Sequence, residues 1–549
     1  MSAVAARWSG LRLQIMWTRL LALVEEQAQT LLRTAFSPIV RESGDLSAGL
    51  FDPSGRMLAQ AVTGTPGLIN TLARSVSAFL AAYPAATMSE GDVYVTNDPW
   101  KGTGHLHDYV VVTPAYHRGT LVALFACSGH MTDVGGIGLT PEATDVFMEG
   151  VVVPLMKLVE RGRVNDALIR IVTANSRAPG PLEGDLYSLM ASNDAAVRRL
   201  RELLEEVDVD DIEALADHIV ESSRRAVIDR VRALPQGTAT QRMRVDGFEA
   251  PLDLVATLTI DGDNVLVDWA GTSAASKYGI NVPFNYAAAY VSYALACVIA
   301  PDVPNNEGSL SVYQMTVPAG CILNAQRPQP LSCRHILGGL LPDVVLGCFD
   351  QLVPGRAPAE SASSLWTLTV RGGPADRGYT ISIVTTGGTG ARPGQDGLSA
   401  TAFPSVVRGT PVEIVEQASP LVFWRRELRP DSGGQGERRG GLGQDMEIGT
   451  RDGCAFTLFA AFDRIEHPAR GRAGGASGAP GELRRGNGKV LSGKGAHRLE
   501  PEERLIVKTP GGGGYGDPAR RSSGANALDR IRGYIIANGG ADESRAEQT

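Results

Sequence analysis

Two neighbouring β-rich runs constrain the fold of this chain more than any other feature. The segments DYVVVTPAY and TLVALFACS flank the tripeptide His117-Arg118-Gly119. Runs rich in β-branched and aromatic residues on either side of a glycine-containing turn are typical of an antiparallel β-hairpin. The stretch from Gly102 to Asp133 that contains both runs also holds four of the eight histidines in 549 residues. We therefore expect the hairpin to carry a specialised site.

The spacing predicts which polar residues meet at the open end of this hairpin. A turn centred on Arg118 places two pairs opposite each other, Asp108 with residue 128 and His105 with residue 131. Because facing Cα atoms lie about 4.5–5.5 Å apart, His105, Asp108 and His130 should converge. Two imidazoles and a carboxylate suit a borderline divalent metal such as Zn, Mn or Fe. A polar hairpin mouth with hydrogen-bonded histidines is the alternative that the spacing leaves open.

The other two histidines of the stretch are predicted to be bystanders. His117 falls in the turn, where it should be solvated. His107 is adjacent to ligand candidates in sequence, but alternation along an extended chain would point it to the opposite face.

Three further aspartates are candidates for the same site. Asp45 begins another strand in RESGDLSAGLFD and is either a fourth ligand or the cap of a turn. Asp98 in TNDPW and Asp133 in HMTDVGG could act as a general base, although a turn at the surface is the commoner place for such residues.

The whole chain reads as an α+β, multi-domain protein. We expect mixed and antiparallel sheets with packed helices and a glycine-rich β C-terminal region, because 64 glycines imply many turns and close backbone approaches. The predicted division is an N-terminal α+β domain with the hairpin (1–235), a central α/β domain (236–364), a C-terminal β-rich and glycine-rich domain (365–520), and a short helix with a disordered tail (521–549).

Composition excludes several classes of partner. A net charge of −8 provides no cationic field for nucleic acid or an anionic membrane. The longest apolar run is too short to span a bilayer. The six cysteines are spread singly, which is typical of reduced thiols in a cytoplasmic protein. The stretch GKVLSGKG has Gly495 where a phosphate-binding P-loop requires Ser or Thr.

Several longer motifs resemble those of the hydantoinase B/oxoprolinase family. They are SPIVRESGDLSAGLFD, TNDPWKGTGHLHD, CSGHMTDVGG, GINVPFNYAAAY, RPDSGGQGERRGGLGQ and TPGGGGYGDP. The resemblance covers residues 12 to 520. The family includes the B-type component of ATP-dependent N-methylhydantoinases, the C-terminal half of 5-oxoprolinase, and a large subunit of acetone and acetophenone carboxylases.

The resemblance implies a site, a partner and a reaction. By matching motifs, the metal ligands would be Asp45, His105, Asp108 and His130, with Zn or Mn, or Fe, as the metal. His107 and Thr132 depart from the residues usual at their positions. Family members work with an A-type subunit of actin-like ATPase fold, so this chain would form a hetero-oligomer and would not itself bind ATP.

In that scheme the partner phosphorylates a lactam oxygen and this chain completes the hydrolysis of a cyclic amide C–N bond. Asp133 or Asp98 could carry the proton. Candidates for phosphate or carboxylate contacts are Arg41, Arg177 and Arg334, since arginine offers a bidentate fork, although each could equally be a structural ion-pair partner.

Three alternatives remain open from the sequence. The first is a subunit of an acetone- or acetophenone-type carboxylase. The second is a non-haem iron oxygenase with two histidines and one carboxylate, against which a fourth ligand, Asp45, would count. The third is a non-enzymatic, structural subunit in which the metal only stabilises the hairpin.

Overall fold

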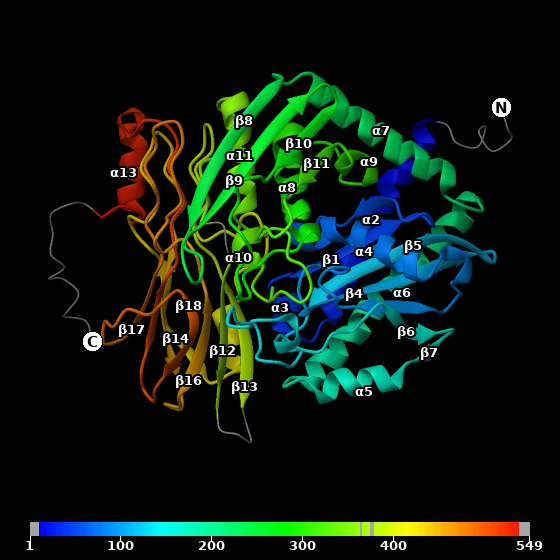
Figure 1. Ribbon diagram of the computed structural model, residues 1–549, viewed down its shortest axis with the longest axis horizontal. Helices are drawn as coiled ribbons and strands as arrows, with labels where there is room; N and C mark the ends of the chain where they lie inside the picture. The colour runs from blue at the N-terminus through cyan, green and yellow to red at the C-terminus, as the bar shows by residue number, and fades with distance from the viewer. Residues whose placement is uncertain (1–9, 363–364, 374–377, 537–549) are drawn as a thin grey trace.

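The computed structural model describes residues 10–362, 365–373 and 378–536. Figure 1 shows an N-terminal sheet and its helices at one end of the molecule, a β-rich C-terminal region at the other, and a smaller sheet with helices between them. The expected α+β architecture with several antiparallel sheets is confirmed. The tail beyond residue 536, predicted to be disordered, lies outside the described residues, and the domain boundaries given above stay predictions.

A seven-stranded antiparallel sheet, in the order β2-β1-β5-β4-β3-β6-β7, forms the N-terminal part. Its strands are β1 (Leu46–Phe51), β2 (Met57–Gln60), β3 (Val93–Thr96), β4 (Asp108–His117), β5 (Thr120–His130), β6 (Met156–Glu160) and β7 (Arg163–Val164). The accompanying helices are α2 (Gly10–Thr34), α3 (Pro38–Arg41), α4 (Pro66–Ala82), α5 (Asp166–Ala174), α6 (Pro179–Val207) and α7 (Glu213–Arg232), with short 3₁₀ turns η1 (Ala85–Thr87) and η2 (Val146–Met148).

The hairpin strands β4 and β5 are buried on both faces. Alternate side chains of β4 pack on opposite layers: Val111 joins the core formed with α6, whereas Val110 and Val112 join the core formed with α4. This burial explains why both strands read as nearly continuous apolar runs. Packing on both faces therefore fixes the position of the hairpin and of the side chains at its open end.

The central part is a four-stranded sheet in the order β11-β10-β9-β8, in which β10 and β11 are parallel. Its elements are β8 (Gly237–Val245), β9 (Leu252–Asp261), β10 (Asn264–Asp268), α8 (Phe284–Ile299), α9 (Glu307–Leu310), β11 (Tyr313–Thr316), α10 (His335–Gly338) and α11 (Leu341–Leu352). Helices α8 and α11 share one hydrophobic core with this sheet. The loop before α10 reaches back to the hairpin.

Two four-stranded antiparallel sheets enclose one core in the C-terminal part, in the orders β13-β12-β16-β18 and β14-β15-β19-β17. The elements are β12 (Trp366–Gly372), β13 (Tyr379–Thr385), α12 (Val412–Ala418), β14 (Leu421–Leu428), β15 (Gln444–Thr450), β16 (Phe456–Ala461), β17 (Glu482–Arg485), β18 (Lys494–Leu499), β19 (Leu505–Lys508), η3 (Pro518–Arg520) and α13 (Ser523–Ile531).

Beside this sandwich, glycine-rich segments pack backbone against backbone. The amide of Gly434 donates to the carbonyl of Gly512 (2.9 Å), and the amide of Gly512 donates to that of Gly441 (3.0 Å). A Cβ on Gly512 would come within 2.0 Å of the carbonyl oxygen of Thr389. Only glycine permits such an approach, which accounts for the glycine content of this region.

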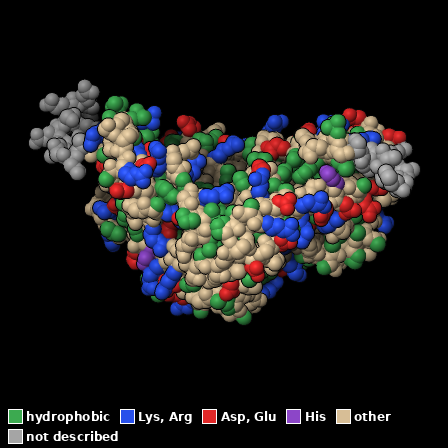
Figure 2. Space-filling model, turned by 90° about the horizontal axis from the view of Figure 1, so that it is seen from above, with side chains coloured by type: hydrophobic (Ala, Val, Ile, Leu, Met, Phe, Trp, Pro, Cys, Tyr) green, Lys and Arg blue, Asp and Glu red, His purple; other side chains and the backbone are tan. Residues whose placement is uncertain are grey.

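The described surface is charged but mixed. In Figure 2, basic and acidic side chains are interspersed over the face shown. No helix among the described residues is long and apolar enough to cross a membrane.

Candidate metal centre

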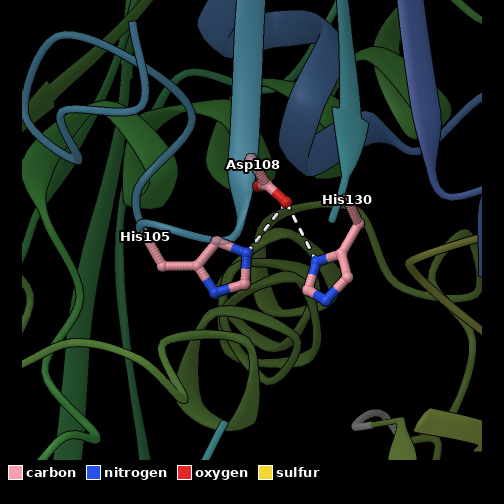
Figure 3. A group of neighbouring side chains, drawn as sticks. All are labelled: His105, Asp108 and His130. Carbon is pink, nitrogen blue, oxygen red and sulfur yellow. Dashed lines mark hydrogen bonds and ion pairs between the residues drawn. The ribbon is translucent and has the colours of Figure 1, made fainter. Parts of the chain in front are cut away.

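The open end of the β4–β5 hairpin brings together the side chains that the spacing singled out. Asp108 begins β4, His130 ends β5, and the register places them directly opposite each other. Asp108 Oδ1 lies 3.0 Å from His130 Nδ1 and 2.8 Å from His105 Nε2 (Figure 3). One potential ligand atom from each of the three side chains lies within 4.8 Å of the others. All three side chains are buried.

The register differs from the prediction by two residues. The turn contains two residues, Arg118 and Gly119, both with positive φ, and an irregularity between Ala115 and Tyr116 adds a further shift. Asp108 therefore faces His130 rather than residue 128. A bulge of this kind leaves no clear signal in a run of apolar residues.

The predictions for the two bystander histidines were wrong. The ring of His107 lies 5.3 Å from that of His130 and 5.4 Å from that of His105. Alternation does not apply to it because residues 105–108 form a turn, closed by the amide of Asp108 on the carbonyl of His105. His117 is the last residue of β4, pairs with Thr120 and is only 4% exposed.

The tautomer of His105 is fixed from outside the hairpin. Its Nδ1 lies 2.9 Å from the carbonyl oxygen of Ser332, which can only accept, so Nδ1 carries the proton. Burial, reinforced by the charge of Arg334, lowers the pKa of His105 to about 4. The ring is consequently neutral near pH 7, and Nε2 presents a lone pair toward Asp108.

This arrangement leaves the Nε2 lone pair of His105 facing an acceptor, whereas Nδ1 of His130 shares a hydrogen bond with the same carboxylate oxygen. The Nε2 atoms of His105 and His130 are buried and have no hydrogen-bond partner among the described residues. A lone pair 2.8 Å from a carboxylate oxygen is repulsive unless a cation lies between the two groups. The donor set therefore fits a divalent metal better than a set of mutual hydrogen bonds.

Asp45 adds a second carboxylate beside His130. Its Oδ2 lies 3.8 Å from His130 Nδ1, and its side chain is 19% exposed. Burial raises the pKa of Asp45 to about 6. The charge of His130 lowers this pKa, and the charge of Asp108 raises it further. Two imidazole nitrogens and two carboxylates form a ligand set that suits Zn or Mn.

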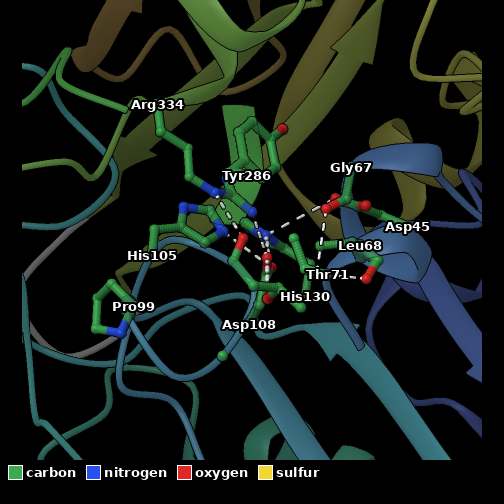
Figure 4. Close-up of polar contacts among 12 residues, drawn as sticks. Asp45, Gly67, Leu68, Thr71, Pro99, His105, Asp108, His130, Tyr286 and Arg334 are labelled. Atoms are coloured by element: carbon green, nitrogen blue, oxygen red, sulfur yellow. Dashed lines mark hydrogen bonds and ion pairs between the residues drawn. The ribbon is translucent and has the colours of Figure 1, made fainter. Parts of the chain in front are cut away.

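Arg334 holds the other oxygen of Asp108. Arg334 Nη2 lies 2.5 Å from Asp108 Oδ2, its Nε donates to the carbonyl of Thr103, and its guanidinium lies 3.9 Å from the centre of the Tyr286 ring (Figure 4). Burial raises the pKa of Asp108, but His105 and Arg334 outweigh it and hold that pKa well below its usual range. Asp108 is thus ionised, with Oδ1 directed at the histidines.

Glu149 holds in place the loop that contains Ser332 and Arg334. It is fully buried, and its Oε1 accepts the amides of Leu331 (2.5 Å) and Ser332 (2.8 Å). That loop presents the Ser332 carbonyl to His105 and the Arg334 side chain to Asp108. Sequence reasoning missed Glu149, because no local pattern marks a residue whose partners lie about 180 positions away.

The structure gives the remaining predicted site residues other partners. Both oxygens of Asp133 are engaged, Oδ1 by the amides of Gly135 and Arg177 and Oδ2 by the Arg177 side chain. Asp98 accepts the amide of Trp100 and lies 3.5 Å from Arg327. Arg41 is exposed and pairs with Glu42. Their predicted catalytic and binding roles stay predictions.

A sequence model described as hydantoinase B/oxoprolinase matches residues 9–518 of the chain. The chain is 28% identical to the beta subunit of the caprolactamase of Pseudomonas jessenii, over 94% of this chain and 92% of that protein. It is also 28% identical to the 5-oxoprolinase of Dictyostelium discoideum, over 93% of this chain but only 41% of that longer protein.

Two solved structures share the fold. The crystal structure of the ATP-dependent caprolactamase from P. jessenii matches with a TM-score of 0.89 and 26% identity, covering 98% of both chains. A nucleotide-free structure of acetone carboxylase matches with a TM-score of 0.84 and 20% identity, over 97% of this chain and 79% of that one. The second likeness shows the fold alone.

Proposed function

Because the chain belongs to the hydantoinase B/oxoprolinase family, we propose that it is the metal-dependent catalytic subunit of an ATP-dependent enzyme that hydrolyses a cyclic amide. The observation that carries the proposal is the buried convergence of His105, Asp108 and His130, with the Asp45 carboxylate beside them. The Nε2 atoms of both histidines have no hydrogen-bond partner among the described residues. Such a site costs stability unless a cation completes it.

The reaction requires a partner. Two relatives are themselves named as parts of larger enzymes, one as the beta subunit of caprolactamase and the other as the B-type component of a putative D-/L-hydantoinase. Their names support a second subunit here too. We assign ATP binding to that partner, an A-type ATPase of actin-like fold, and place the hetero-oligomer in the cytoplasm. The six cysteines are free thiols, as suits a reducing compartment.

The residues of this chain prepare the site for hydrolysis of an amide whose oxygen has been phosphorylated. Ser332 fixes the tautomer of His105, and Arg334 orients Asp108, so the ligand atoms are already in place. A divalent cation bound there would polarise a substrate oxygen and lower the pKa of a nearby water. Asp133 and Asp98 stay the candidates for carrying a proton to the ring nitrogen as the C–N bond breaks.

Carboxylation of a ketone is the second candidate. The fold shared with acetone carboxylase favours it, and the same centre could polarise an enolate oxygen. The oxygenase alternative is weaker, because Asp45 stands where such a site needs an open position.

The test is to co-express the chain with an actin-like ATPase subunit and to assay two reactions in parallel. We expect ATP-dependent opening of a lactam ring, abolished by His130→Ala. ATP-dependent incorporation of bicarbonate into a ketone, without ring opening, would instead identify a carboxylase. A complex that carries metal and remains fully active as His130→Ala would contradict the assigned centre.

A further inference from the structure

A cavity of about 760 Å³ lies where the three parts of the molecule meet. Its walls come from α2, the segment after β2, the first turns of α4, the C-terminal half of α8 with the loop that follows, and Val406 of the C-terminal part. Sites for small molecules are preferentially found at such junctions.

The cavity is lined to accept an uncharged, apolar group. No Lys or Arg is among the described residues that line it, and most of them are aliphatic or aromatic. Two apolar side chains at the lining are unusually exposed, Val62 at 92% and Val406 at 53%. Gln60 and Asn305 add neutral amide groups, which match the N–H and C=O of another amide.

The fixed charge in the lining is negative. Glu25 is half-buried and accepts the amides of Val62 and Thr63. Burial raises the pKa of Glu25, but hydrogen bonds led by those from Thr63 and Gln29 lower it overall. Asp302 is exposed and paired with Arg230. A carboxylate carried on a ring in this space would meet Glu25, and no cation among the described lining residues would offset the repulsion.

The cavity lies beside the segment that carries Asp45. Gly64 and Pro66 line the cavity, and Gly64 packs against the carbonyl of Leu46, the residue after Asp45. Gly67 packs against the rings of Tyr290 and Tyr286, which a Cβ on Gly67 would approach to 2.7 Å and 2.8 Å. Figure 4 shows Gly67, Asp45, Tyr286 and Arg334 around the same centre.

We propose that this cavity binds the uncharged, largely apolar ring of a cyclic amide substrate. The inference rests on the proposed function and narrows it. Lactams without a charged substituent would be accepted, and cyclic amides that carry a carboxylate, such as 5-oxoproline, would be rejected.

Cys297 provides a direct readout, because it lines the cavity and is exposed, whereas four of the other five cysteines are buried. The experiment measures the rate of maleimide modification of Cys297 in the full chain carrying Cys454→Ser. A pH of about 8.5 is used because desolvation by the cavity walls raises the pKa of this thiol. The probes are 2-piperidone and 5-oxoproline at equal millimolar concentrations.

We expect 2-piperidone to slow the modification several-fold and 5-oxoproline to leave the rate unchanged. Equal protection by both, or protection by 5-oxoproline alone, would overturn the inference, and so would the absence of protection by 2-piperidone at saturating concentrations.

A matched pair of variants on α8 tests the location independently. Ala296→Phe fills the cavity, whereas Ala288→Phe places the same ring in a different groove on the same helix. In calorimetric titration with 2-piperidone, Ala296→Phe should weaken binding by about tenfold or more and Ala288→Phe by less than about twofold. Equal affinities in the two variants would contradict the location.

These measurements need neither ATP nor the partner, so they separate the two proposals. Protection of Cys297 without lactam hydrolysis in the complex would leave the cavity assignment standing and refute the proposed reaction. Lactam hydrolysis in the complex without protection of Cys297 would support the proposed reaction and refute the cavity assignment.

Discussion

Two buried clusters of charged groups behave differently in this molecule. One is the proposed metal centre, formed by Asp45, His105, Asp108 and His130. The other, the Arg464 cluster, consists of Asp343, Glu360, Arg464 and Arg470, and joins α11 to the C-terminal part. Arg464 lies 3.2 Å from Asp343 and 3.1 Å from Glu360, and Arg470 holds the other oxygen of Glu360.

The Arg464 cluster is completed by the protein's own charges. Burial lowers the pKa of Arg464, but Glu360 and Asp343 more than compensate and raise it. In the metal centre Arg334 neutralises one oxygen of Asp108, while two imidazole lone pairs stay without donors. Burial of charge therefore does not by itself mark a functional site; the mark is a convergence of acceptors that the chain leaves incomplete.

The largest effect that distinguishes the clusters is expected from Arg464→Leu. It removes the buried cation that two buried carboxylates share, which should cost about 3–5 kcal/mol of unfolding free energy. Metal content should not change, because the cluster holds no ligand of the metal centre. Thermal unfolding and elemental analysis of the purified variant check both points.

Arg470→Leu is the matched control. Its side chain is 45% exposed, so its removal should destabilise the protein far less. If the Arg464→Leu protein remains folded but loses its metal, the two clusters are not independent, and the account is contradicted.

A smaller effect is expected from Arg334→Met at the metal centre. Without its guanidinium, Asp108 loses the bond that directs Oδ1 toward the histidines, and metal affinity should fall roughly 10–100-fold. Competition with a chromophoric chelator measures the affinity. The control is Arg327→Met, whose side chain is 47% exposed and lies 3.5 Å from Asp98; an equal loss in both variants would rule out a specific role for Arg334.

The smallest effect concerns Glu149, whose pKa burial raises to about 8 although the amides of Ser332 and Leu331 oppose the shift. The folded state thus holds a proton that the unfolded state releases above its ordinary pKa near 4.5. This stabilisation is complete below that ordinary pKa and is lost as pH rises through about 8.

The Tm of the wild-type protein should therefore fall between about pH 6 and 9. In Glu149→Gln this fall should be smaller by roughly 1–3 °C. Glu142→Gln, at a half-exposed position nearby, should leave the profile unchanged. Identical pH profiles for wild type and Glu149→Gln would refute this account of the loop.

Local patterns predicted much of the fold. The β4–β5 hairpin carries its own signal, two β-rich runs that flank a glycine-containing turn, and the glycine content predicted the close backbone approaches of the C-terminal part. The convergence of His105, Asp108 and His130 followed from the hairpin alone. The register did not, because the shift at Ala115 and Tyr116 has no signature in an apolar run.

The rest of the site depends on contacts between distant segments. Ser332 and Arg334 reach the hairpin from more than 220 positions away, and Glu149 acts only through their loop. His107 was misplaced because a turn replaced the expected extended chain. The strand position made Asp45 a candidate, but only the resemblance to a family favoured a ligand over the cap of a turn.

The most direct test of the account is metal content by elemental analysis of the purified chain, comparing wild type with His105→Ala and His130→Ala. We predict near-stoichiometric Zn or Mn in the wild type, its loss in both variants, and its retention in His117→Ala, which changes a buried histidine at the other end of the same hairpin. A wild-type protein that stays free of metal after reconstitution, or variants that retain it, would contradict the assignment of this cluster as a metal centre.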